Sequence, residues 1–356
     1  MFEVDASNVL EYFANAGQSQ WDKLGLTAEA LTQSTAIELA WGVSNIVIRV
    51  DSPVRSFVVK QSREQLRTKI DWFSQLDRIW REVDVLHALE SLLPDGAVPR
   101  VLSEDRENYL FTMEAIEADH RVWKADLLSG VFDSSVAETL AGHLAAIHRG
   151  STGNTEIAER TGDQTVFDEL RLDPFYRYVT ETSTRFKQPL TTLIEHTSQR
   201  RDCLVLADFS PKNILLTTTG PVIVDFETGH FGDPGFDIGF FLSHLLLKTV
   251  MHHDRKTEAI APARAFWNVY FEQLSSNPAP QWLADKHRDP SFEQQSVQHL
   301  AACMLARVDG KSRVDYLTLD WQPELIRNYC HHLLTTDDHS RMQDAFDLLE
   351  RSLQSR

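Results

Sequence analysis

Cysteine is scarce in this sequence, and the few cysteines are scattered. Only Cys203, Cys303 and Cys330 occur in 356 residues, and no two form a C-x-x-C pair. This spacing excludes a cysteine zinc site and is typical of a protein in the reducing cytosol. The first residues, MFEVDASNVLEYF, lack the basic and apolar regions of a signal peptide. We therefore expect a cytoplasmic location.

The sequence also has fewer basic than acidic residues, and it has no long apolar run without charged residues. Asp and Glu number 52 against 35 Lys and Arg, which gives a formal net charge of −17. A surface this negative repels phosphate backbones and anionic lipids, so we expect neither a nucleic-acid nor a membrane partner. The most apolar stretch, residues 236–251, contains Asp237, His244 and Lys248, and it is interpreted as a buried helix.

The pattern of apolar residues predicts two lobes of different character. The length exceeds what one hydrophobic core usually organises. Residues 1–33 predict short helices that form an N-terminal extension. Residues 34–116 predict a small lobe with strands and one main helix, because β-branched runs alternate there with turns. Residues 117–356 predict mainly helices, at 136–147, 166–178, 236–250, 261–274, 297–306 and 323–334. A strand-rich segment at 204–226, which contains several Asp and Asn residues, interrupts them. We expect an α+β fold with the chemistry in that segment.

The segment from Asp208 to Asp225 contains the strongest chemical signal. Asp208 and Asn213 lie five residues apart on a loop, and a short β-hairpin then leads to Asp225. Mg²⁺ prefers carboxylate and amide oxygens, with water and phosphate as its other ligands. Phosphoryl transfer also needs a carboxylate that accepts the hydroxyl proton. The pattern predicts Asp208 as catalytic base and Asn213 and Asp225 as metal ligands.

Phosphoryl transfer from ATP also requires a lysine that holds the α- and β-phosphates and a glutamate that holds the lysine. Lys60 stands in the strand-like run FVVKQ, where an edge-strand position is the alternative interpretation. Glu82 lies on the inner face of the next helix and is the most economical partner, because buried charges are normally paired. Glu90 is the second candidate.

The turn before Lys60 is a weaker signal of nucleotide binding. Gly42, Ser44 and Asn45 follow Trp41 between the first two predicted strands. Their backbone N–H groups are able to fold over phosphates, although many hairpins have a similar composition.

Together these motifs closely resemble the aminoglycoside phosphotransferase and choline kinase family. The resemblance rests on Gly42-Val-Ser-Asn45, Lys60, Glu82, Asp208-x-x-x-x-Asn213, Asp225-Phe-Glu227 and Gly232-Asp-Pro-Gly-Phe-Asp237. The run GFDIGFFLSHLLLK is most similar to the methylthioribose kinase branch. The resemblance implies a bilobal protein-kinase-like fold with ATP in the cleft and Mg²⁺ as the metal.

The resemblance also implies roles for residues that the motifs alone do not explain. Residues 112–116 would be the hinge, with the backbone of Glu114 and Ile116 contacting adenine. Asp237 would brace the catalytic loop, residues 206–213, by accepting backbone hydrogen bonds.

The sequence departs from the family pattern at two places. Leu206-Ala207 stand where the family usually has His-Gly, which bears on the rigidity of the loop more than on its chemistry. Only seven residues separate Asp225 from Asp233, and no A-P-E follows. There is no room for a peptide-docking activation segment, so we expect no protein substrate.

Three polar patches are candidates for the acceptor site: residues 168–176, 227–233 and 306–312. Each is also compatible with a helix end satisfied by charge. Arg307 would suit a hydroxylated or anionic acceptor, and Asp309 would suit an amine. The candidate acceptor ligands are Glu227, Asp233, Arg307 and Asp309. His148 is interpreted as a helix-terminal residue only.

The sequence thus predicts an ATP-dependent kinase that phosphorylates a hydroxyl of a small molecule. A sugar such as methylthioribose is the first acceptor candidate, an aminoglycoside the second, and choline or ethanolamine the third. The alternative is a catalytically silent nucleotide-binding module that acts through partner binding, which the unusual Leu206-Ala207 pair supports.

Overall fold

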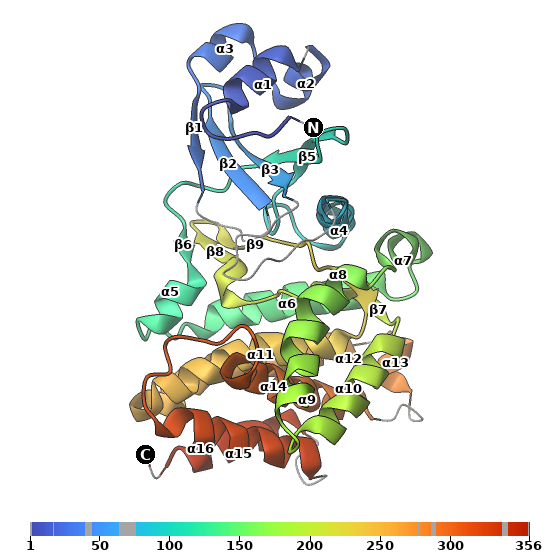
Figure 1. The fold of residues 1–356 in the computed structure, drawn as a ribbon, viewed down its shortest axis with the longest axis vertical. Helices are drawn as coiled ribbons and strands as arrows, with labels where there is room; N and C mark the ends of the chain where they lie inside the picture. Colours follow the sequence, from blue (N-terminus) through green and yellow to red (C-terminus); the bar gives the residue numbers. More distant parts are fainter. Residues whose placement is uncertain are drawn as a thin grey trace. The chain divides into compact units, whose positions relative to one another are not determined.

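The computed structural model describes residues 2–16, 18–39, 45–63, 76–276, 278–285, 290–336, 341–354 and 356. The chain divides into two compact units, Met1–His120 (unit 1) and Arg121–Arg356 (unit 2) (Figure 1). Unit 1 is built around one sheet, and unit 2 is mainly helical.

Unit 1 contains a five-stranded antiparallel sheet with the strand order β1-β2-β3-β5-β4. Its strands are β1 (Thr35–Glu38), β2 (Asn45–Asp51), β3 (Ser56–Ser62), β4 (Val101–Asp105) and β5 (Leu110–Glu114). The turn Ser52-Pro53-Val54-Arg55 joins β2 to β3, as its proline and serine favour. The predicted strands of this region are confirmed, and β3 occupies the centre of the sheet.

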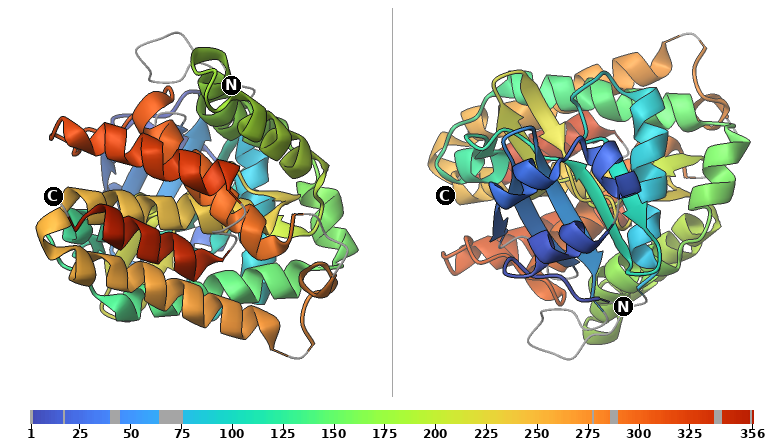
Figure 2. Two further views of the ribbon diagram at one scale, coloured as in Figure 1. Left: turned by 90° about the horizontal axis from the view of Figure 1, so that it is seen from below. Right: turned by 90° about the horizontal axis from the view of Figure 1, so that it is seen from above.

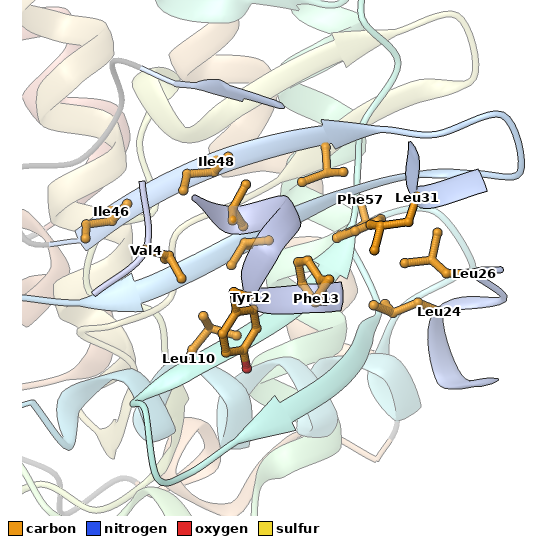
Figure 3. Packing of buried hydrophobic residues seen from close by; sticks show 13 residues of the cluster. Val4, Tyr12, Phe13, Leu24, Leu26, Leu31, Ile46, Ile48, Phe57 and Leu110 are labelled. Atoms are coloured by element: carbon orange, nitrogen blue, oxygen red, sulfur yellow. The ribbon is translucent and has the colours of Figure 1, made fainter. Parts of the chain in front are cut away.

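Residues 1–33 share one hydrophobic core with the sheet. They form α1 (Val9–Asn15), α2 (Gln18–Leu24) and α3 (Ala28–Thr32), which lie over the strands in the right-hand view of Figure 2. Figure 3 shows the contact from close by: Phe13 faces Phe57, with ring centres 5.3 Å apart in an edge-to-face arrangement. Alternate residues of β2, Ile46, Ile48 and Val50, point to the same core. The helices therefore cover one face of the sheet.

The remaining helix of unit 1 is α4 (Arg78–Leu92). Its buried residues recur at three-to-four spacing, from Ile79 through Val83 and Leu86 to Leu89, as the sequence pattern predicts. The helix contacts β3 and β4.

Unit 2 is built from helices that pack around a few short strands, and Figure 2 (left) looks onto its long helices. The helices are α5 (Trp123–Leu128), α6 (Ser134–Ser151), α7 (Thr155–Thr161), α8 (Thr165–Phe167), α9 (Tyr178–Thr182), α10 (Lys187–Gln199), α11 (Pro234–Met251), α12 (Lys256–Ser275), α13 (Gln281–Ala284), α14 (Phe292–Asp309), α15 (Trp321–Thr335) and α16 (Met342–Ser352). The strands are β6 (Arg121–Val122), β7 (Cys203–Val205), β8 (Ile214–Thr217), β9 (Gly220–Ile223) and β10 (His230–Gly232).

Helix α11 is the central helix of unit 2. Asp233 caps its first turn by accepting a hydrogen bond from Gly235 N at 3.0 Å, and Pro234 follows at the first helical position. The helix packs closely against α14. A Cβ at Gly239 would lie 2.4 Å from the Cβ of His299, so only glycine permits this approach. The prediction of a buried helix is confirmed, and none of the described helices is long and apolar enough to span a membrane.

Two features of unit 2 differ from the sequence expectation. The predicted α-helix at 166–178 is largely a π-helix, residues Asp168–Arg177, with Pro174 inside it. Proline lacks the N–H that an α-helix needs at an interior position, and a π-helical segment accommodates this. The helices α10 and α16 were not predicted, although α16 is amphipathic with Met342, Phe346 and Leu349 buried.

We expect Phe13→Ala to lower the free energy of unfolding by about 3–5 kcal/mol, because the ring is fully buried against the sheet. Phe2→Ala is the matched control, since this ring is 43% exposed and should change stability by less than about 1 kcal/mol. Urea unfolding followed by tryptophan fluorescence measures both. Equal effects of the two substitutions would contradict the packing described for residues 1–33.

Candidate active site

Lys60 and Glu82 form a buried ion pair in unit 1. The Nζ atom of Lys60 lies 2.8 Å from Oε1 and 2.6 Å from Oε2 of Glu82, and both side chains are almost inaccessible to solvent. Lys60 stands opposite Val47 on one neighbouring strand and Phe111 on the other, so it belongs to a central strand and not to an edge. Glu90 is exposed and its carboxylate lies near Val101 N. The predicted pairing of Lys60 with Glu82 is therefore confirmed.

The other residues predicted to contact nucleotide are only partly visible. Gly42 and Ser44 lie outside the described residues. Asn45 is buried at the start of β2, and Glu114 is the last residue of β5. The carbonyl of Ile116 accepts a hydrogen bond from Arg49 Nη1 at 2.7 Å, which fixes the backbone just after the strand.

Asp208 lies on a loop of unit 2 with cations on both sides of its carboxylate. Arg171 Nη2 is 3.0 Å from Oδ1, and Lys212 Nζ is 2.8 Å from Oδ2. Asn213 Nδ2 donates to Oδ2 at 2.9 Å and to the Asp208 carbonyl at 3.0 Å. The carboxylate is only 6% exposed. These contacts fix the orientation of the carboxylate.

The hairpin of β8 and β9 brings Asn213 next to the residues around Asp225. Ile214 stands opposite Ile223 in this antiparallel pair. Val224 N then donates to the carbonyl of Asn213 at 3.0 Å, which extends the ladder by one step. Asp225 follows directly, so the three predicted oxygen groups lie at one end of the hairpin.

Backbone strain is concentrated at this end of the hairpin. Ala207 has φ of 58° and Asp225 has φ of 73°, a conformation that costs a non-glycine residue about 1–2 kcal/mol. Tyr109 is the remaining described non-glycine residue with positive φ, and it lies in unit 1. Strain that persists at a polar site is a feature of functional geometry.

Asp237 holds the strained loop in place. Its Oδ1 accepts a hydrogen bond from Ala207 N at 2.7 Å, and its Oδ2 accepts one from Leu206 N at 2.8 Å. Thr228 Oγ1 donates to the Leu206 carbonyl at 3.0 Å, and Arg171 Nε donates to the Ala207 carbonyl at 2.7 Å. Every backbone polar group of Leu206 and Ala207 is thus bound by a side chain. The loop is well supported despite the absence of His-Gly.

His148 lies in the last turn of α6, as interpreted from the sequence, but it is more than a helix-terminal residue. Helix α6 continues to Ser151, and His148 is fully buried. Its Nε2 lies 3.3 Å from Asp237 Oδ2, and its Nδ1 lies 2.7 Å from the hydroxyl of Tyr270. His148 therefore orients Asp237, which in turn binds the backbone of the catalytic loop.

Arg171 and Lys212 are site residues to which the sequence analysis assigned no role. Lys212 lies inside the Asp208–Asn213 motif, and its position four residues after Asp208 is the sequence feature that could have indicated their ion pair. Arg171 comes from the π-helix, 37 residues before Asp208 in the sequence, and no local pattern connects the two. Its three nitrogens contact Asp208, the Ala207 carbonyl and the Leu170 carbonyl.

The four candidate acceptor ligands have different surroundings. Glu227 is half-buried in the turn after Asp225. Asp233 is buried and contacts Gly235 N, Thr197, Gln295 and His299. Asp309 is bound by both Nε and Nη2 of Arg327, with Nη2 at 2.8 Å. Arg307 donates to the hydroxyl of Ser312 at 2.6 Å.

Two hollows on unit 2 do not include the Asp208 loop. One, of about 360 Å³, is lined by Arg185, Asp309, Arg313 and Arg327 among others. The other, of about 330 Å³, lies between α15 and α16 near Tyr329. Neither contains the strained backbone or the predicted catalytic groups.

The chain belongs to the phosphotransferase enzyme family (APH), whose model matches residues 35–270. Methylthioribose kinase 1 of Oryza sativa subsp. japonica is 27% identical over 310 residues, covering 76% of this chain and 70% of the relative. A methylthioribose kinase of Klebsiella pneumoniae is 25% identical over 241 residues, 60% of each chain. The chain is a phosphotransferase that acts on the hydroxyl group of a small molecule.

Solved structures share the kinase-like α+β fold. An amicoumacin kinase in complex with AMP-PNP and Ca²⁺ has a TM-score of 0.53 at 14% identity, covering 95% of this chain and 99% of that one. The ethanolamine kinase of Plasmodium vivax has a TM-score of 0.50 at 10% identity, covering 100% and 94%. The predicted bilobal protein-kinase-like fold is confirmed.

We expect Ala207→Gly to leave the melting temperature unchanged or raised. Glycine adopts φ of 58° without a steric cost, and this gain offsets the loss of one buried methyl group. Ala141→Gly is the matched control, because Ala141 is equally buried but lies within α6, where glycine costs about 1 kcal/mol. Differential scanning calorimetry compares them. If Ala207→Gly lowered the melting temperature as much as Ala141→Gly, the backbone strain inferred at Ala207 would be contradicted.

Proposed function

We propose that this protein transfers the γ-phosphate of ATP to a hydroxyl group of a small sugar-like metabolite, with Asp208 as the general base. The acceptor oxygen forms a bond to the γ-phosphorus while the bond to the β,γ-bridging oxygen breaks. ADP leaves with that electron pair, and the Asp208 carboxylate takes the hydroxyl proton. Lys60, held by Glu82, binds the α- and β-phosphates.

The observation that carries this proposal is the fixed carboxylate of Asp208, which follows a strained backbone segment whose polar groups are all hydrogen-bonded. Asp237, Thr228 and Arg171 bind the backbone just before it. A base must be held within hydrogen-bond reach of the hydroxyl, and such rigidity supports this role. Arg171 and Lys212 are positioning residues for Asp208 in this scheme.

The residues near Asp225 fit a magnesium ion. The Nδ2 of Asn213 is committed to Asp208, which leaves the amide oxygen of Asn213 as a ligand beside the Asp225 carboxylate. Mg²⁺ usually takes one or two protein oxygens and fills its other positions with water and phosphate. A small protein donor set is therefore adequate. The ion would neutralise phosphate charge, and Asn213 and Asp225 would hold it.

The proposed acceptor is a small hydroxylated compound, first a sugar such as methylthioribose. The relatives at 25–27% identity are methylthioribose kinases, which supports this class. The short link from Asp225 to Asp233 argues against a peptide substrate. The buried positions of Cys203, Cys303 and Cys330 are compatible with the cytoplasm.

We expect Asp208→Asn to lower kcat at least about 100-fold with any acceptor that the wild type phosphorylates, because the general base is lost. Binding of AMP-PNP should be retained. Asp320→Asn, an exposed carboxylate in the same unit, is the control and should keep full activity. ADP release is measured with pooled sugars, amino alcohols and aminoglycosides. Full turnover by the Asp208 variant would refute the assignment, and AMP-PNP binding without turnover in any pool would favour the silent module.

Asp225→Asn should raise the Mg²⁺ concentration for half-maximal activity at least about tenfold, because a carboxylate ligand is replaced by a neutral amide. Asp119→Asn, which changes an exposed carboxylate, should leave that concentration unchanged. A magnesium titration of the initial rate at saturating ATP distinguishes the two. An unchanged titration curve for the Asp225 variant would exclude it as a ligand.

A further inference from the structure

Two cations of unit 2 lack a carboxylate partner: Lys248 is buried, and Arg307 is half-buried with a buried Nε atom. Lys248 on α11 is 1% exposed, and its Nζ donates to the carbonyl of His244 at 3.1 Å. Arg307, in the last turn of α14, is bound to the hydroxyl of Ser312. In the described ranges no carboxylate oxygen lies within 4 Å of either cation. Buried charges are normally paired, so this arrangement is unusual.

Other arginines of unit 2 show the usual arrangement. Arg177 is paired with Asp168 at 2.6 Å, and Arg327 is paired with Asp309 at 2.8 Å. The second pair is informative because Asp309 lies only two residues from Arg307. The nearest acidic residue in the sequence is thus already paired with another cation, and it is not a direct partner of Arg307.

Polar atoms beside these cations also lack hydrogen-bond partners. The Nε of Arg307, the hydroxyl of Tyr316 and the Nε2 of His244 are buried, and none has a partner in the part of the chain that the structure describes. They come from three segments, α14, the loop after it, and α11. Lys248 Nζ lies 5.4 Å from the ring centre of Tyr316. We call His244, Lys248, Arg307 and Tyr316 the basic cluster.

The electrostatics of the basic cluster favour an anion. Burial, and then the charges of Lys124 and Arg307, lower the pKa of Lys248 to about 7. Burial, followed by the charge of Lys248 and then that of Arg307, lowers the pKa of His244. Burial also lowers the pKa of Arg307. Positive charges that disfavour one another in this way are stabilised by a negative group placed among them.

The basic cluster lies close to the catalytic loop. The guanidinium carbon of Arg307 lies 5.9 Å from the ring centre of Phe175, and Phe175 stacks on Phe240 with ring centres 6.0 Å apart. The guanidinium carbon of Arg171 lies 5.6 Å from the ring centre of Phe240, and its Nη2 contacts the Asp208 carboxylate at 3.0 Å. A hydroxyl group at Asp208 and an anionic group at Arg307 can therefore belong to one small molecule. Cationic acceptors such as aminoglycosides or choline would be repelled at the same place.

We propose that the acceptor of this phosphotransferase carries an anionic group, a carboxylate or a phosphate monoester, which Arg307 and the Tyr316 hydroxyl bind while the reacting hydroxyl lies at Asp208. Lys248 supplies a further positive charge, which a bound anion stabilises. This inference rests on the proposed phosphoryl transfer at Asp208, but it replaces the neutral sugar methylthioribose as the first acceptor candidate. It selects hydroxylated acids or sugar phosphates over neutral and cationic acceptors.

The test compares matched anionic and neutral compounds on protein saturated with AMP-PNP and Mg²⁺. Ribose 5-phosphate is compared with ribose, and gluconate with glucose, by thermal shift at constant ionic strength. A compound that binds the folded state raises the melting temperature in proportion to its affinity. We expect at least one anionic member to bind about tenfold or more tightly than its neutral parent. The pair that shows the difference distinguishes phosphate from carboxylate.

Three variants connect that preference to the basic cluster. Arg307→Gln should reduce the preference for the anionic compound over its neutral parent to about twofold or less. Tyr316→Phe removes only an unpartnered hydroxyl, so it should weaken anion binding about threefold without unfolding the protein. Arg313→Gln is the matched control, because this exposed arginine contacts the Gly310 carbonyl instead. It should keep the full preference.

Several outcomes would overturn the inference. These are equal shifts for neutral and anionic compounds, no shift with either anionic compound, or an undiminished preference in both Arg307→Gln and Tyr316→Phe. A tenfold loss of AMP-PNP affinity in Arg307→Gln would assign the cluster to the nucleotide and also overturn it. The proposed function fails on different results: no stabilisation of the wild type by AMP-PNP with Mg²⁺, or full turnover by Asp208→Asn.

Discussion

The geometry of the active-site loop depends on one buried carboxylate, that of Asp237. It is fully inaccessible to solvent and accepts the backbone N–H groups of two consecutive residues, Leu206 and Ala207. His148, itself bound to Tyr270, contacts the same carboxylate from the opposite side. Three helices, α6, α11 and α12, therefore meet the loop through a single side chain. Without those two acceptors, buried N–H groups would lose their partners, and each loss costs about 1–3 kcal/mol.

The buried acidic residues of unit 2 differ from Lys248 and Arg307 in how their charges are compensated. Its buried acids, such as Asp233 and Asp237, have their oxygens occupied by backbone and side-chain donors. Its buried Lys248 and half-buried Arg307 have no carboxylate partner among the described residues. The net charge of −17 gives no indication of this local excess, because most of the acidic side chains lie on the surface. The net charge of the whole chain thus bears on solubility, whereas the pairing of individual charged side chains bears on where a ligand binds.

Sequence reasoning succeeded where the signal is local. The strand that carries Lys60 and the helix that carries Glu82 follow from apolar spacing, and the pairing follows from the cost of burying a lone charge. It failed where a partner lies far away in the sequence. His148 contacts a residue 89 positions later, and no helical pattern reveals this contact. Similarly, the π-helix that presents Arg171 could not be predicted, since an interior proline is also compatible with a simple helix break.

The structural costs retained at the site argue for chemistry over a silent binding module. Ala207 and Asp225 keep positive φ angles, each a cost of about 1–2 kcal/mol. Lys60 and Glu82 keep a buried ion pair, which a pair of apolar residues would often replace without loss of stability. Folding alone requires none of these features. Each has a reason if a base and a metal ligand must be held rigidly and a lysine must be presented to phosphate. The same argument explains why Leu206 is tolerated: its side chain is buried, while the side chains of Asp237 and Thr228 hold its backbone.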